Sequence, residues 1–85
     1  MGNGYDYYDL MIDELIKLRK EKGLSQNDLA LKIQSSLSYI QDIENQTIML
    51  EPREMTFILA VLGYDTFELF RRVKLRKENS SGLDS

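Results

Sequence analysis

The chain has 85 residues, 42% of them hydrophobic and 29% charged, and carries a net charge of −3. A single small domain of this size has too thin a core to provide both a scaffold and an active-site cavity. The sequence has no cysteine and no histidine, which removes disulfides, thiolate metal sites and the commonest general base. We therefore expect no enzyme activity, no metal, no other cofactor and no small-molecule substrate.

Targeting signals are also missing from the sequence. No apolar run approaches the roughly 18 residues that a membrane span requires. The N-terminal residues show neither a secretion signal nor the Ser or Thr of a myristoylation signal. The sequence thus predicts a cytoplasmic protein with no membrane partner.

Residues 1–8 contain two glycines and three tyrosines and predict a flexible N-terminal lead. An N-terminal arm that touches DNA is the weaker alternative, because Asp6 and Asp9 would repel phosphates. A first helix is predicted from about 9 to 22, with Met11, Leu15 and Leu18 on its core face. Gly23 can then take the left-handed conformation that often ends a helix.

Two short amphipathic helices are predicted next, at about 25–33 and 36–44. Ser25 caps the first of them, with Asp28 three residues later in an approximate capping box. Ser35 or Ser36 caps the second, which buries Ile40 and Ile43. Because so short a connection does not allow antiparallel packing, the two helices must cross steeply. This arrangement is a helix-turn-helix.

Two further helices are predicted at about 52–62 and 66–75, followed by a disordered tail over 78–85. The fourth helix has one apolar stripe for the core and a second, with Phe57 and Val61, that faces a partner subunit. Phe67, Phe70 and Val73 are expected on the apolar face of the fifth. Five cations follow, and they either complement the end of that helix in solvent or extend toward phosphates; they are Arg71, Arg72, Lys74, Arg76 and Lys77.

The spacing of several residues across these helices resembles that of the Cro/repressor-type (XRE) helix-turn-helix family of small bacterial and phage regulators. The resemblance covers roughly residues 15–72, and the matching residues are Leu18-Arg19, Gly23-Leu24-Ser25-Gln26, Leu29-Ala30, Ile33, Ile40, Ile43-Glu44, Leu50-Glu51-Pro52-Arg53-Glu54-Met55 and Leu62-Gly63-Tyr64-Asp65. It implies an all-α, five-helix, lambda-repressor-like DNA-binding domain. It also implies a structural salt bridge between Arg19 and Glu44, so Arg19 is not counted as a DNA contact.

By the same resemblance the helix at 36–44 is the recognition helix, whose N-terminal residues face bases in the major groove. Leu37 can contact a thymine methyl, Ser38 suits either base type, and Asp42 can accept from a cytosine amine. Gln26 matches a phosphate-binding position. The residues expected to contact DNA are Gln26, Ser36, Leu37, Ser38, Tyr39, Gln41, Asp42, Asn45 and Thr47.

Structural alternatives stand beside these assignments. The serines can act only as helix caps, Leu37 can pack on the turn, and Gln41 with Asp42 can form a solvated face. The family usually has Gly where this chain has Gln34, because the turn requires a positive φ. Gln there costs roughly 1–2 kcal/mol or forces a shifted turn, which changes the aim of the recognition helix.

The charge distribution opposes tight DNA binding. Between Ser25 and Glu51 a single lysine faces four carboxylates, whereas residues 52–77 have a net charge of +3. DNA-binding surfaces are usually basic. The leading hypothesis is a sequence-specific transcriptional regulator, a repressor where its site overlaps a promoter, that binds double-stranded DNA as a homodimer on a two-fold symmetric operator. The alternative is a protein-interaction module, a co-regulator or antitoxin-like partner, with weak or no DNA binding. Expected dimer contacts are Phe57, Val61, Phe67 and Phe70.

Overall fold

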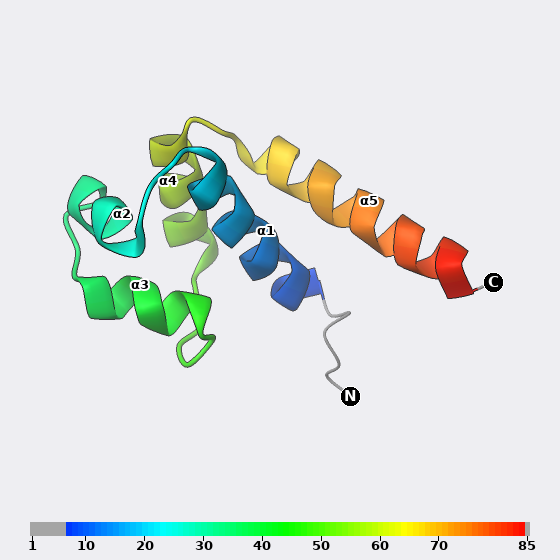
Figure 1. Ribbon diagram of the computed structural model, residues 1–85, viewed down its shortest axis with the longest axis horizontal. Helices are drawn as coiled ribbons and strands as arrows, with labels where there is room; N and C mark the ends of the chain where they lie inside the picture. Colours follow the sequence, from blue (N-terminus) through cyan, green and yellow to red (C-terminus); the bar gives the residue numbers. More distant parts are fainter. Residues whose placement is uncertain (1–6, 85) are drawn as a thin grey trace.

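The computed structural model describes the backbone of residues 7–84 and the side chains of residues 7–79, and these form five helices with no strand (Figure 1). The helices are α1 (Tyr7–Glu21), α2 (Gln26–Lys32), α3 (Leu37–Glu44), α4 (Pro52–Leu62) and α5 (Thr66–Asp84). The prediction of an all-α, five-helix domain is confirmed. The first six residues of the expected flexible lead lie outside the described part of the chain.

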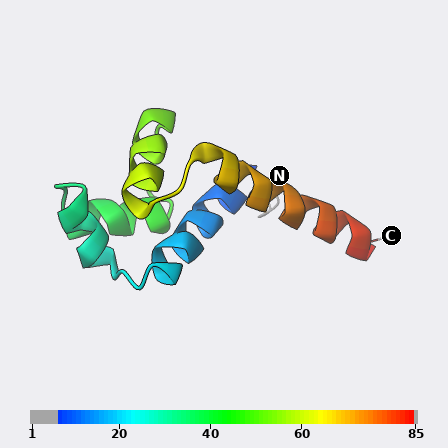
Figure 2. The same ribbon diagram turned by 90° about the horizontal axis from the view of Figure 1, so that it is seen from above.

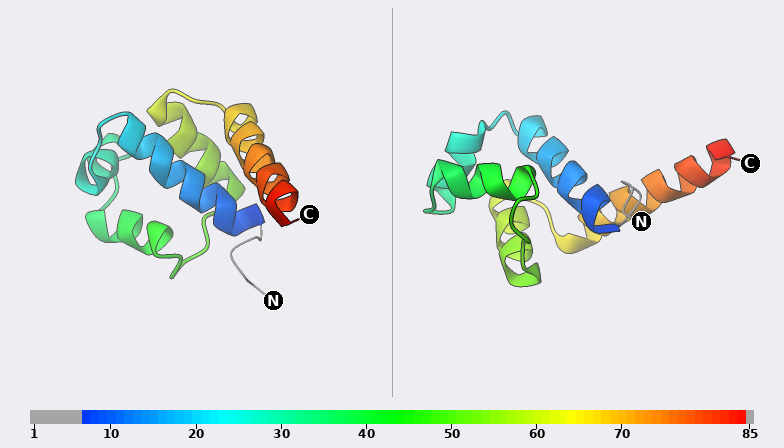
Figure 3. Two further views of the ribbon diagram at one scale, coloured as in Figure 1. Left: turned by 45° about the vertical axis from the view of Figure 1, so that its right-hand side comes forward. Right: turned by 90° about the horizontal axis from the view of Figure 1, so that it is seen from below.

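Helix α1 is the central element of the fold, because α3, α4 and α5 all pack against it. Helices α2 and α3 contact each other at one end of the molecule, and α5 lies alongside α1 at the other (Figures 1 and 3). The C-terminal part of α5 projects beyond the rest of the domain (Figure 2). The two short helices are therefore held away from α5, with one face open.

Local sequence signals explain where α2 and α3 begin. The Ser25 hydroxyl accepts from the Asp28 amide, and the Asp28 carboxylate accepts from the Ser25 amide, which completes the capping box. Hydrogen bonding of the Asp28 carboxylate to the Ser25 backbone amide, and then to the Ser25 side chain, lowers the pKa of Asp28, since it favours the ionised form. Ser36, rather than Ser35, caps α3 by accepting from the Tyr39 amide at 3.2 Å. The starts of both helices of the helix-turn-helix are thus fixed by side chains that the sequence places there.

Sixteen buried hydrophobic side chains form the core among the described residues. They are Leu10, Ile12, Leu15, Leu18, Leu29, Ala30, Ile33, Ile40, Ile43, Leu50, Met55, Ile58, Leu59, Leu62, Leu69 and Val73. The core face predicted for α3, with Ile40 and Ile43, is the one observed. In α1 the prediction needs correction, because Leu10 and Ile12 are buried and Met11 is only half-buried.

The N-terminal boundary of α1 also differs from the prediction. Tyr7 and Tyr8 belong to α1 rather than to a flexible lead. The Tyr8 hydroxyl accepts from the Leu50 amide at 2.8 Å, which ties the start of α1 to the segment between α3 and α4. This long-range bond gives a partner to the backbone N–H of Leu50, which lies between two helices. No local pattern in the sequence reveals it.

Helix α5 requires two corrections. It continues to Asp84, so the helix does not end near 75 and residues 78–84 are not an irregular tail. Its core contacts are made by Leu69 and Val73, whereas Phe67 and Phe70 are 74% and 55% exposed. The prediction that Phe67 and Phe70 face the core is therefore wrong. Leu69 and Val73 are buried on this helix, and the two phenylalanines lie on its exposed side.

No helix in the described part of the chain is long and apolar enough to span a membrane.

Candidate nucleic-acid interface

Helix α3 presents one face to the core and the opposite face to solvent. Ile40 and Ile43 are almost fully buried, at 1% and 2% exposure. Ser36, Ser38 and Gln41 are exposed, and Leu37 is 39% exposed. Leu37, Ser38 and Gln41 therefore share the outer surface of α3, whereas Asp42, the third residue predicted to contact a base, is half-buried. The packing of Leu37 onto the turn, which was the structural alternative, leaves more than a third of its surface uncovered.

A buried ion pair fixes this helix against α1. Arg19 donates from Nε and Nη2 to the two carboxylate oxygens of Glu44, at 2.7 Å and 3.0 Å. Its remaining nitrogen, Nη1, donates to the Leu24 carbonyl at 2.7 Å. Both charged side chains are less than a tenth exposed. The structure thus contains the salt bridge that the family resemblance implies, and this bridge sets the position of the C-terminal end of α3.

Gln26 takes part in the same network. Its side-chain amide donates to Glu44 Oε1 at 2.9 Å, the oxygen that also accepts from Arg19. The sequence predicted a phosphate contact for Gln26, and the structure shows that one of its two amide hydrogens is already used inside the protein. Gln26 thereby links the start of α2 to the end of α3, next to the surface where a phosphate would lie.

The turn between α2 and α3 has the positive φ that the resemblance implies. Gln34 has a φ of +58°, and Ser35 donates from its amide to the Ala30 carbonyl at 2.8 Å. Of the two possibilities raised by the sequence, a strained turn or a shifted one, the structure shows the left-handed conformation with a non-glycine residue. The turn that leads into α3 therefore carries local backbone strain.

Just beyond the exposed half of α3, Asp42 and Thr47 are bonded to each other. The Thr47 hydroxyl lies 3.1 Å from Asp42 Oδ1 and also within reach of the Asp42 carbonyl. Asp42 is half-buried, and Asn45 and Thr47 are exposed. Asn45 and Thr47, which were both expected to contact DNA, therefore lie at and just beyond the C-terminal end of α3, where Asn45 caps the helix. The hydroxyl of Thr47 is oriented by Asp42 rather than left to rotate in solvent.

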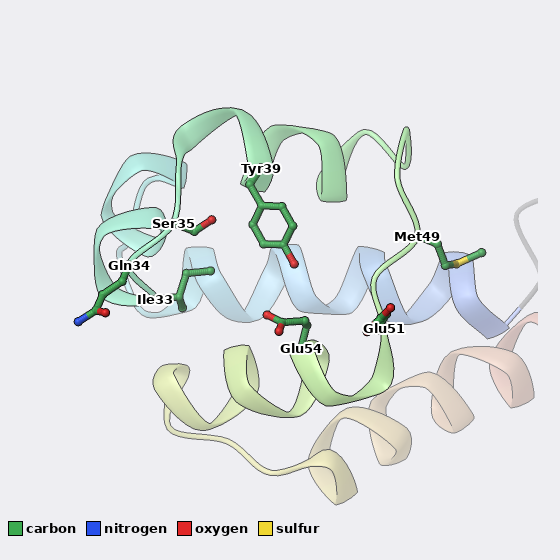
Figure 4. A pocket seen from close by; sticks show the side chains of 7 residues that line it. All are labelled: Ile33, Gln34, Ser35, Tyr39, Met49, Glu51 and Glu54. Atoms are coloured by element: carbon green, nitrogen blue, oxygen red, sulfur yellow. The ribbon is translucent and has the colours of Figure 1, made fainter.

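Tyr39 faces a different surface from Leu37 and Ser38. Its ring points into a hollow of about 510 Å³ between α3 and α4, with Glu51 and Glu54 around its hydroxyl (Figure 4). Burial raises the pKa of the Tyr39 phenol, and the nearby charges of Glu54 and Glu51 raise it further. The hydroxyl is therefore in a negative environment, which is unfavourable for a phosphate contact.

Two of the five cations that the sequence places near the C-terminus pair with carboxylates of α1. Arg72 donates to both carboxylate oxygens of Glu21 and to Glu68, and Arg76 donates to Asp13 and Glu14. These bonds raise the pKa values of both guanidinium groups. The two arginines thus attach α5 to α1. From the sequence, only solvent or phosphate was expected as their partner.

A buried carboxylate is the part of this network that the sequence analysis did not find. Glu14 is 4% exposed and lies 3.1 Å from Arg76 Nη1, 3.6 Å from Lys17 Nζ and 3.9 Å from Arg72 Nη1. A buried charge is tolerated when it is paired in this way. An acidic residue inside the apolar pattern of α1, three residues before Lys17, is the only sequence signal for it.

A family model for helix-turn-helix domains matches residues 15–69, which is more than half of the chain. The chain belongs to the XRE-type helix-turn-helix family. The prediction of this family is confirmed. Searches of curated proteins and of solved structures gave no match.

Membership of the XRE-type helix-turn-helix family indicates a DNA-binding regulator as the class of function, and the family is typically non-enzymatic. The matched stretch contains every residue that the sequence analysis placed at DNA, from Gln26 to Thr47. It ends within the first turn of α5. The arginine network that holds α5 to α1 therefore lies largely outside the part that this chain shares with the XRE-type family.

Proposed function

We propose that the chain is a sequence-specific, DNA-binding transcriptional repressor that acts in the cytoplasm as a homodimer on a two-fold symmetric operator. One observation supports this above the others: Glu44, bonded to Arg19 and Gln26, holds α3 so that Leu37, Ser38 and Gln41 share one exposed surface. A rigidly held helix with an exposed N-terminal half fits the major groove. Repression follows where the operator overlaps a promoter.

The proposed binding has a limited electrostatic contribution. Residues 33–52 contain no lysine or arginine, and Arg72 and Arg76 are bonded to α1. Few phosphates are then neutralised, so the salt dependence of the affinity has a shallow slope. Two recognition helices in one dimer, spaced one helical turn of DNA apart, supply the affinity that one domain lacks.

The test is selection of bound duplexes from a random pool at low salt. The proposal expects enrichment of a site with two-fold symmetry and half-site centres roughly 34 Å apart. The selected duplex is then bound by the wild-type chain and not by a variant that carries Leu37→Ala and Ser38→Ala. The matched control is Asn27→Ala with Leu31→Ala, which removes one exposed polar and one exposed apolar side chain from α2. Absence of any enriched sequence contradicts the proposal.

A second candidate function is a protein-interaction module, and a specific observation favours it. The hollow between α3 and α4 is lined by Tyr39, Glu51 and Glu54 (Figure 4), and neither carboxylate has an ion-pair partner among the described residues. Such a surface is complementary to a basic segment of another protein. A co-regulator or antitoxin-like role follows if the chain binds no DNA.

The two candidates predict different responses to one substitution. Glu54→Gln removes a negative charge that would repel phosphate, so it leaves DNA binding intact or strengthens it. The same change weakens binding of a basic protein segment, because it removes one of the charges that attracts it. The wild-type chain and Glu54→Gln are therefore compared in two measurements, a gel shift with the selected duplex and a titration with an oligolysine peptide. Loss of affinity for the peptide alone favours the protein-interaction module.

A further inference from the structure

An apolar groove lies where the first turns of α1, α4 and α5 meet. It has a volume of about 240 Å³ and is lined mainly by hydrophobic side chains, among them Tyr8, Met11, Pro52, Met55, Thr56 and Phe70. This groove is separate from the exposed surface of α3 and from the acidic hollow beside Tyr39. Contiguous apolar surface of this kind marks an interaction site when it is also accessible.

Two exposed aromatic rings stand at the groove. Phe70 lines it and is 55% exposed, and Phe67, one turn earlier on α5, is 74% exposed. Residues three apart on a helix lie on the same face, so Phe67 projects beside the groove that Phe70 helps to form. The same face of the molecule therefore carries both a hollow and a protruding ring.

We propose that this face binds a second copy of the chain, with Phe67 of each molecule inserted into the groove of the other. A contact of this type is isologous: each molecule supplies the ring and the groove, and the two contacts are related by a two-fold axis. An apolar cavity of about 150 Å³ accommodates a benzene ring, so a groove of about 240 Å³ accommodates a phenylalanine side chain. The inference gives a surface to the homodimer that the proposed function requires.

The two exposed rings supply part of the area that such a dimer needs. A phenylalanine side chain carries about 200 Å² of surface. Given their exposed fractions of 74% and 55%, Phe67 and Phe70 together leave roughly 250 Å² of ring surface open to solvent. The groove walls add to this. Stable interfaces bury about 800 Å² per partner, and so the two rings form the central part of an interface whose rim includes neighbouring residues of α4 and α5.

A self-complementary face favours a second copy over a different protein. A partner that only filled the groove would leave Phe67 exposed, and a partner that only covered Phe67 would leave the groove empty. A second copy covers both features with the same pair of contacts. None of the residues proposed to face DNA takes part, and thus dimerisation can be measured with no DNA present.

The experiment is sedimentation of the full chain across a range of concentrations, with two variants that alter opposite sides of the contact. Phe67→Ser removes the ring, and Thr56→Trp fills the groove; both side chains are exposed, so neither change disturbs the core. The wild-type chain is expected to shift from 9.9 kDa to twice that mass as concentration rises. Each variant is expected to need at least tenfold more protein to do so, while the control Leu31→Ser on α2 behaves as wild type.

Mixing the two variants provides the decisive measurement. In a mixed dimer, the chain with Thr56→Trp supplies Phe67 and the chain with Phe67→Ser supplies an open groove, so one of the two contacts is intact. The mixture should therefore associate at lower concentration than either variant alone. Variants that fail to weaken the dimer, or a mixture no better than its components, overturn the proposal.

A wild-type chain that stays at 9.9 kDa at every concentration also overturns it. Such a monomer that still selects a duplex would leave the DNA-binding proposal standing. A dimer that selects no duplex would leave this interface standing without it.

Discussion

Arg19 and Glu44, which are 25 positions apart in the sequence, form a two-point ion pair that is nearly closed to solvent. The pair joins α1 to the last residue of α3, and Gln26 and the Leu24 carbonyl complete its hydrogen bonds. Removing one member of such a pair leaves the other charge buried without compensation. The position of α3 and the stability of the domain are therefore connected through these two residues.

Glu44→Leu is expected to lower the free energy of unfolding by about 3–5 kcal/mol, because the Arg19 guanidinium then remains buried without its carboxylate. Chemical denaturation followed by circular dichroism measures the loss. Replacing both residues, as Arg19→Met with Glu44→Leu, should cost much less than the single change. The control is Arg71→Met, whose exposed pair with Glu68 contributes roughly 1 kcal/mol or less. Equal losses in Glu44→Leu and the double variant would contradict this account.

The strained turn gives a second prediction. Gln34 has a φ of +58°, a conformation that costs a non-glycine residue roughly 1–2 kcal/mol. Gln34→Gly should therefore raise the free energy of unfolding by about 1 kcal/mol, less than the full strain because glycine also makes the unfolded chain more flexible. The matched control is Gln41→Gly, the same substitution at an exposed position inside α3, which should lower it by about 1 kcal/mol. Denaturation curves should therefore show changes of opposite sign in the free energy of unfolding for the two variants.

The parts of the structure that could be predicted from the sequence are those set by local patterns. Ser25 with Asp28, and Ser36, fix the starts of α2 and α3, and the apolar stripes of these helices fix their buried faces. The pair of Arg19 with Glu44 followed from the family spacing, since charges 25 residues apart carry no local signal. The exposed surface of α3 was predictable from the apolar stripe that fixes the buried face of this helix and from the family spacing.

The remaining features depend on which helices meet in space. Tyr8 was assigned to a flexible lead, because nothing near it shows that its hydroxyl accepts from Leu50. The cations of α5 were assigned to solvent or phosphate, because the carboxylates that bind Arg72 and Arg76 are more than 50 residues away on α1. Of the three residues expected on the apolar face of α5, Val73 is buried, whereas Phe67 and Phe70 are exposed and the unpredicted Leu69 takes their place in the core.

The attachment of α5 to α1 predicts a pH dependence of stability. Hydrogen bonds from Arg72 lower the pKa of Glu21, and those from Arg71 and Arg72 lower that of Glu68, from an ordinary value of 4.5. Because the folded state binds these protons more weakly than the unfolded state, the stabilisation is present above pH 4.5 and is lost as the pH falls through the lowered values.

Arg72→Gln should therefore reduce stability most at neutral pH, and the difference from wild type should shrink as the pH falls from about 5 to 3. Denaturation curves at several pH values measure it. Lys74→Gln, which removes an exposed cation from the same helix, should change stability little and by a similar amount throughout. With no histidine in the chain, stability should be nearly constant between about pH 6 and 8. A constant difference between Arg72→Gln and wild type across the acid range would contradict the assignment.

The last prediction concerns how Asp42 reads DNA under the proposed function. Its carboxylate can accept from a cytosine amine, and Thr47 already fixes one of its oxygens at 3.1 Å. Asp42→Asn replaces this acceptor by an amide that suits adenine, so one position in each half-site should change from cytosine to adenine, with a discrimination of about 1–3 kcal/mol. Removing a negative charge near phosphate should also strengthen binding to any duplex.

Glu51→Gln is the control for the second effect, because it removes a charge beside Tyr39 without changing the outer face of α3. Glu51→Gln should leave the selected sequence unchanged, and any effect it has should be a higher affinity for duplexes of every sequence. Selection from a random pool, repeated with both variants, gives both results at once. If Asp42→Asn selects the same sequence as the wild-type chain, Asp42 belongs to the solvated face of α3 and does not read bases. The direct readout would then rest on Leu37, Ser38 and Gln41, the exposed residues nearer the start of the helix.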